Sequence, residues 1–129
     1  MIDIKTLKQY PLSFSLLEKW VEQKHTTSLA LLLDKVTNEE LVEFLDDELI
    51  YISTDIEIIG SDEWDFSYSI NWLPIQHYNA KRRSVCFETK YSYKDSGSSY
   101  TGAWRTRKEA TEAAIQKAFE LLEQKLKLN

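Results

Sequence analysis

Residues 100–126 read YTGAWRTRKEATEAAIQKAFELLEQKL, which is the end of a strand followed directly by a long helix. Thr106 is a good N-cap, and Glu109 three residues later completes a capping-box pattern. Small and apolar residues then recur at the spacing of one helix face, namely Ala110, Ala113, Ala114, Ala118, Leu121 and Leu122. Because alanines let a helix backbone approach a flat surface closely, we expect this helix to lie across the aromatic strands before it.

The strands that would form this surface begin where the hydrophobic period changes from 3.6 to 2, after residue 49. The predicted strands are 50–52, 56–59, 64–72, 85–93 and 99–105. Residues 53–55 break the alternating pattern between the first two predicted strands. Residues 73–83 are typical of an irregular connection. A turn at 95–98 predicts a hairpin between the last two strands.

The first 49 residues have helical periodicity. The predicted helices are 5–10, 14–23, 28–35 and 39–49. Pro11 ends the first helix, Ser13 caps the second, and Thr37 with Glu40 forms a capping box before the fourth. The helix at 28–35 is apolar nearly all round, which predicts either burial on more than one side or an exposed patch that binds a partner.

These elements predict the α+β class. We expect N-terminal helices, then a three- to four-stranded antiparallel sheet covered on one face by the long C-terminal helix. A chain of 129 residues with 43% hydrophobic residues is long and apolar enough for one folded domain, 1–129. Within it, residues 1–49 form the helical part, and residues 50–129 form the sheet and its covering helix.

Composition also limits the classes of function. The single cysteine, Cys86, excludes an intramolecular disulfide and any cysteine-based metal site. No apolar run approaches transmembrane length, and residues 1–5 lack the pattern of a signal peptide. We therefore expect a cytoplasmic protein that makes no membrane contact, and no motif points to a cofactor.

Charge is distributed unevenly along the chain. Residues 1–74 contain five Lys or Arg and fifteen Asp or Glu, whereas residues 75–129 contain eleven and six. The net charge of −5 therefore divides into −10 for the first part and +5 for the second. This asymmetry indicates either two solvated faces or a bipolar surface that meets a charged partner.

The second half resembles a known family. Residues 87–93, a turn, residues 100–102 and the alanine-rich helix start at 106–114 resemble the second half of the double-stranded RNA-binding domain (dsRBD), over about 64–125. In that family the basic N-terminus of the helix contacts RNA phosphates. The resemblance implies a dsRBD-like sheet and places Arg107 and Lys108 on the phosphates, although Thr111 replaces a third basic residue.

A basic candidate site follows from the cations and aromatic residues around this helix start. Its members are Lys81, Arg82, Arg83, Tyr100, Trp104, Arg105, Arg107 and Lys108. The helix N-terminus adds partial positive charge, and the aromatic residues offer surfaces on which bases stack. These residues predict RNA or DNA binding, unless they are ordinary surface cations and sheet aromatics.

An acidic candidate site is formed by Glu39, Glu43, Asp46 and Asp47 on the helix at 39–49. Small acidic proteins without a catalytic motif, including some carried by phages and mobile elements, act as adaptors or inhibitors. We expect the chain to be a non-catalytic binding module, as a monomer or a dimer, whose first partner is an unidentified protein and whose alternative partner is RNA or DNA.

No reaction chemistry is indicated. His25 and His77 have no nearby residues at the spacing of metal ligands or of a catalytic base, and the acidic clusters lack calcium-loop spacing. The sequence therefore predicts no enzyme, no metal site and no cofactor.

Overall fold

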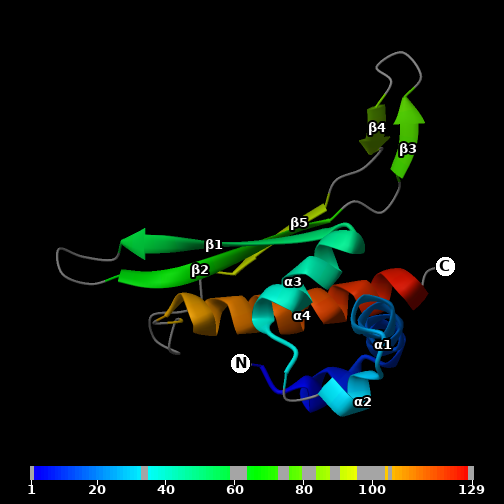
Figure 1. Cartoon of the computed structure of the whole chain (residues 1–129). Helices are drawn as coiled ribbons and strands as arrows, with labels where there is room; N and C mark the ends of the chain where they lie inside the picture. The colour runs from blue at the N-terminus through cyan, green and yellow to red at the C-terminus, as the bar shows by residue number, and fades with distance from the viewer. Residues whose placement is uncertain are drawn as a thin grey trace.

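The structure is a computed structural model that describes residues 2–32, 35–58, 64–72, 76–79, 84–87, 91–95, 104 and 106–127. Its helices are η1 (Ile4–Gln9), α1 (Pro11–His25), α2 (Leu29–Leu32), α3 (Asn38–Asp47) and α4 (Arg107–Lys127). Its strands are β1 (Ile50–Ile58), β2 (Trp64–Trp72), β3 (Gln76–Asn79), β4 (Ser84–Phe87) and β5 (Tyr91–Asp95). The chain therefore has the predicted α+β class, with helices first and a C-terminal helix against an antiparallel sheet (Figure 1).

The main sheet is antiparallel and has β2 at its centre, in the order β1-β2-β5. β1 pairs with β2 without interruption over nine positions, from Ile50 opposite Trp72 to Ile58 opposite Trp64. The continuous pairing shows that the predicted break at 53–55 is wrong. Alternation is weak there because Ser53 and Thr54 are both polar, yet Ser53 Oγ lies 2.6 Å from Ser69 Oγ of β2 and supports the pairing.

α4 packs on one face of this sheet against β1 and β2 (Figure 1). Ala110, Ala114 and Ala118 have no exposed surface, so the alanine stripe meets the sheet as predicted. The backbone N–H of Glu109 donates to Thr106 Oγ1 at 3.1 Å, which confirms Thr106 as the cap of the helix.

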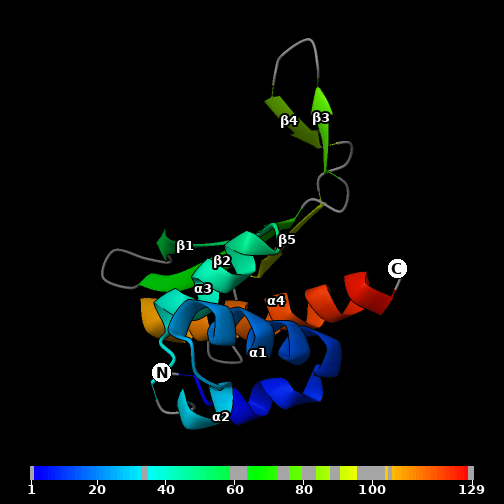
Figure 2. The ribbon, with the colours of Figure 1, turned by 45° about the vertical axis from the view of Figure 1, so that its right-hand side comes forward.

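One hydrophobic core joins the sheet to the helices. Its buried members from α1, α3, β1, β2 and α4 include Leu17, Val21, Leu41, Phe44, Leu45, Ile50, Tyr68, Ile70, Ile115, Phe119 and Leu122. The rings of Phe44 and Phe119 lie 5.5 Å apart and connect α3 to α4. Both helices therefore lie on the same side of the sheet, with α1 packed beneath them (Figures 1 and 2).

α1 begins earlier than the sequence predicts. Pro11 occupies the first turn of α1, where a backbone N–H would have no acceptor within the helix, so the missing N–H of proline does not destabilise it. The helix therefore begins at Pro11, two residues before Ser13. Ser13 is buried inside the first turn and is not the cap. Its hydroxyl donates to the carbonyl oxygen of Phe119 at 3.1 Å.

α2 covers Leu29–Leu32, and residues 33–34 of the predicted helix at 28–35 lie outside the described residues. Leu29 is buried, but 75% of Leu31 is exposed, so burial on several sides is wrong for the described part of this helix. The fourth helix is confirmed with its cap at Thr37, and it ends at Asp47. Leu49, with φ of 64°, turns the chain from α3 into β1.

Between β2 and β5 the chain forms a second antiparallel pair, β3 with β4 (Figure 2). The expectation of an irregular connection at 73–83 is therefore wrong for residues 76–79. The predicted strand 85–93 is divided between two sheets, because β4 pairs with β3 and β5 pairs with β2. Period-two alternation is the same on both sides of this division, so the pattern cannot reveal it. Residues 96–98 of the predicted turn at 95–98, and residues 99–103 and 105 of the predicted last strand, lie outside the described residues.

Candidate binding surface on α3 and α4

α3 presents an acidic side to solvent because its cap and its buried apolar residues fix the orientation of the helix. Thr37 Oγ1 accepts a hydrogen bond from the Glu40 backbone N–H at 3.2 Å and fixes the first turn. Leu41, Phe44 and Leu45 face the core. The opposite side exposes all four predicted acidic residues, Glu39, Glu43, Asp46 and Asp47.

Two of these four carboxylates contact α1. Glu43 forms an ion pair with Lys24 at 2.5 Å, and Asp47 accepts a hydrogen bond from Trp20 Nε1 at 2.7 Å. The Lys24 ammonium also lies 4.8 Å from the centre of the Trp20 ring. Glu43 and Asp47 therefore help to hold α1 on α3, although 55% of the Glu43 side chain remains exposed.

A third contact joins the last turn of α1 to the first turn of α3. His25 Nε2 lies 2.6 Å from Glu40 Oε2, and both side chains are half-buried. His25 is thus a contact between helices, which its isolated position in the sequence gave no means of predicting.

Asp46 differs from its neighbours. Its exposed carboxylate forms no hydrogen bond or ion pair with any residue that the structure describes. Its pKa is raised, first by partial burial and then by the negative charges of Asp47 and Glu43. It also stands in the last turn of α3, where the helix dipole disfavours negative charge and where the helix itself has no basic residue; Lys125 of α4 donates instead to the carbonyl oxygen of the C-cap, Glu48, at 3.3 Å. Asp46 is therefore electrostatically unfavourable for the free fold.

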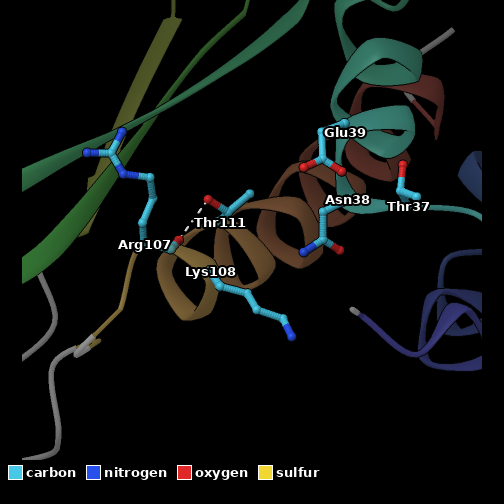
Figure 3. Close-up of a pocket in the computed structure, with 6 residues that line it drawn as sticks. All are labelled: Thr37, Asn38, Glu39, Arg107, Lys108 and Thr111. Atoms are coloured by element: carbon cyan, nitrogen blue, oxygen red, sulfur yellow. Dashed lines mark hydrogen bonds between the residues drawn. The ribbon is translucent and has the colours of Figure 1, made fainter.

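A hollow of about 480 Å³ lies where the N-termini of α3 and α4 approach each other. Its lining, shown in Figure 3, consists of Thr37, Asn38, Glu39, Arg107, Lys108 and Thr111. Two helix N-termini place partial positive charge here, and Glu39 partly opposes it. Of these residues, the sequence predicted Glu39, Arg107 and Lys108 as site residues. For the others, the signals were the cap at Thr37 and the position of Thr111 in the dsRBD-like helix start.

The two cations of the hollow diverge. Arg107 extends toward the sheet, with its guanidinium carbon 5.8 Å from the centre of the Phe66 ring, whereas Lys108 points away from it (Figure 3). Both are exposed. Two diverging cations suit two separate charges along a polymer better than one small anion.

The polar side chains of the hollow have partners inside the protein. Asn38 donates to Glu112 at 3.2 Å and accepts from the Ile2 backbone N–H at 3.2 Å. Thr111 Oγ1 donates to the Arg107 carbonyl oxygen at 2.8 Å. Burial raises the pKa of Glu112, but hydrogen bonds, including the one from Asn38, and the Lys108 charge outweigh it and lower this pKa.

Trp104, from the basic candidate site, is half-buried against the core. Its ring lies 5.0 Å from that of Tyr68, and its carbonyl oxygen accepts a hydrogen bond from the Phe66 N–H at 2.8 Å. It therefore extends the sheet more than it offers a free surface for a base. Lys81, Arg82, Arg83, Tyr100 and Arg105 lie outside the described residues.

Within the described ranges, no three His, Cys, Asp or Glu residues come close enough to hold a metal ion, and no helix is long and apolar enough to cross a bilayer. The described side chains also include no buried polar atom without a hydrogen-bond partner. Comparison with protein-family models, curated proteins and solved structures finds no match to this chain.

Proposed function

We propose that the chain is a non-catalytic binding module whose acidic α3 surface docks on a basic surface of another protein. The observation that carries this proposal is Asp46, an exposed carboxylate at the negative end of a helix, beside two further acids. A site that destabilises the free protein without an internal partner is typical of a functional surface. A cationic partner would relieve the repulsion among these acids.

The module acts as an adaptor or an inhibitor, consistent with small acidic proteins of phages and mobile elements. Glu39 and Asp46 carry the docking, because neither forms an ion pair within the described residues. Glu43 and Asp47 contribute charge while they also hold α1.

The experiment is a binding titration with a lysine- and arginine-rich peptide. The double variant Glu39→Lys/Asp46→Lys should weaken binding by at least about tenfold at low salt, because reversed charges repel the peptide. The matched control Glu18→Lys/Glu22→Lys reverses two exposed acids on α1 and should retain most of the affinity. Equal losses in both double variants would show that only net charge matters and would contradict a defined site.

The hollow between the two helix N-termini favours a second candidate function, binding of RNA or DNA. Arg107 and Lys108 lie at the start of α4, where the dsRBD resemblance would place them on phosphates. The order α3, β1, β2, β3, β4, β5, α4 places the three strands of the main sheet between two helices, which favours a dsRBD-like sheet of three to four strands, although the β3-β4 pair is inserted between β2 and β5. This candidate comes second because Glu39 lines the same hollow and the α3 acids would repel a duplex.

A salt titration with duplex RNA tests the second candidate. Arg107→Gln/Lys108→Gln should weaken binding and reduce the slope of log affinity against log salt by about 2, one for each lost phosphate contact. Lys5→Gln/Lys19→Gln removes the same charge from exposed positions elsewhere and should leave the slope unchanged. Absence of binding to duplex RNA and DNA at low salt would eliminate this candidate.

A further inference from the structure

β1 is an edge strand with an unusually open edge. In the described part of the chain, β2 is the only strand that pairs with it, so one side of the nine-residue backbone has no strand partner. Proteins usually protect such edges with proline, lysine, a bulge or a short strand. β1 contains no proline and no lysine, and its one-to-one register with β2 leaves no bulge.

The two faces of β1 have different character. Residues with even numbers share the face of Tyr68 and Ile70, which pack against the helices, since Ile52 is opposite Ile70 and Thr54 opposite Tyr68. Residues with odd numbers share the outer face, where Ser53 contacts Ser69. Ile56 belongs to the apolar face, yet 53% of it is exposed.

The sequence of β1, IYISTDIEI, is nearly symmetric about its central residue, Thr54. We propose that β1 binds β1 of a second copy of this chain in antiparallel orientation, with the twofold axis at Thr54. This register places Ile52 opposite Ile56, so apolar residues meet on the helix side. The helix-covered face of one copy also continues into the helix-covered face of the other, because every pair joins two even or two odd positions.

Charge is compatible with the same register. On the outer face, Asp55 lies opposite Ser53, so this acid meets a neutral residue that carries a hydroxyl. No two carboxylates are directly opposite, an arrangement that would destabilise the pair. A shift by one residue would place apolar positions against polar ones and would expose the isoleucines. The pairing also covers the exposed Ile56 with the partner's Ile52 and joins the two sheets into one.

Sedimentation of the full chain over a wide concentration range tests the dimer. The wild type should dimerise as concentration rises, and Ile56→Lys should remain monomeric, because an edge lysine loses its hydration in the pair. Leu31→Lys is the matched control, since it changes the most exposed apolar side chain away from the edge, and it should dimerise normally. A wild type that is monomeric at every concentration would overturn the proposal, as would a dimer that Ile56→Lys leaves intact.

Cross-linking tests the register independently of that variant. In a Cys86→Ser background, Thr54→Cys should form an interchain disulfide, because residue 54 meets itself at a Cα distance of about 4.5–5.5 Å. Ser53→Cys alone should form little, whereas a mixture of Ser53→Cys and Asp55→Cys chains should cross-link. A failure of Thr54→Cys to cross-link in protein that sediments as a dimer would overturn the proposed pairing.

Discussion

Glu123 is the residue that most clearly shows how side chains far apart in sequence complete this fold. It is 4% exposed, and its two carboxylate oxygens accept the backbone N–H groups of Leu12 and Ser13 at 3.1 and 2.8 Å. α1 has no side-chain cap of its own at Tyr10. Glu123 therefore caps α1 from α4 and fixes the angle between the two helices.

Substitution of this cap should be costly. Glu123→Gln should lower the free energy of unfolding by about 2 kcal/mol at neutral pH, because an amide NH₂ would face a backbone N–H and leave it without an acceptor. Denaturant unfolding measures this difference. Glu120→Gln, at a half-buried residue of the same helix turn whose carboxylate forms only a surface ion pair with Lys117, should change it by less than about 0.5 kcal/mol. Equal stability of Glu123→Gln and the wild type would show that the cap does not contribute.

The same residue predicts a pH dependence. Burial raises the pKa of Glu123, but the hydrogen bonds from Ser13 and Leu12 and the charge of Lys127 outweigh it, so the folded pKa lies below its ordinary value. The stabilisation is therefore complete above the unfolded pKa of about 4.3 and is lost as pH falls through the folded pKa. The difference in stability between the wild type and Glu123→Gln should shrink over that acidic range. A difference that grows on acidification would contradict the sign of this shift.

At the scale of elements, α4 depends on small residues for its close approach to the sheet. Ala114→Leu should destabilise the fold by about 2 kcal/mol, because three added carbons must enter space that β1 and β2 already fill. Ala30→Leu adds the same atoms at an exposed position of α2 and should change stability by less than about 0.5 kcal/mol. Thermal or denaturant unfolding measures both. An equal effect at the two positions would mean that α4 is not closely packed.

Features that depend only on residues close together in the sequence could be predicted from it. The Thr106 and Thr37 caps and the alanine stripe each depend on residues within one or two turns, and the structure contains all three. The acceptor that caps α1, Glu123, and the division of residues 85–93 between two sheets depend on residues distant in the sequence. Such long-range determinants leave no periodic pattern in the sequence.

The candidate sites follow the same rule. The exposed acids of α3 could be predicted, because a helical period separates them from Leu41, Phe44 and Leu45. The contacts of Glu43 and Asp47 with α1 could not be predicted, because only the tertiary fold brings Lys24 and Trp20 close to them. The hollow beside Lys108 likewise exists only because two helix N-termini, 69 residues apart from Asn38 to Arg107, come together.

At the scale of the whole molecule, the acidic and basic regions occupy different ends of two neighbouring helices. Asp46 and Asp47 lie in the last turn of α3, whereas Arg107 and Lys108 lie at the start of α4, beside the first turn of α3. The two sites meet at Glu39, which lines the hollow with Arg107 and Lys108, but the backbone amides around Asp46 and those at the start of α4 are separate. This separation allows one spectroscopic experiment to decide between a protein partner and a nucleic acid.

The most direct test is a titration of ¹⁵N-labelled protein with a lysine- and arginine-rich peptide, followed by amide chemical shifts. The proposed function predicts that the largest changes fall on α3, centred on Asp46, and that Glu39→Lys/Asp46→Lys abolishes them. Absence of changes on α3, or changes confined to residues 107–111 that duplex RNA reproduces, would contradict the acidic docking surface.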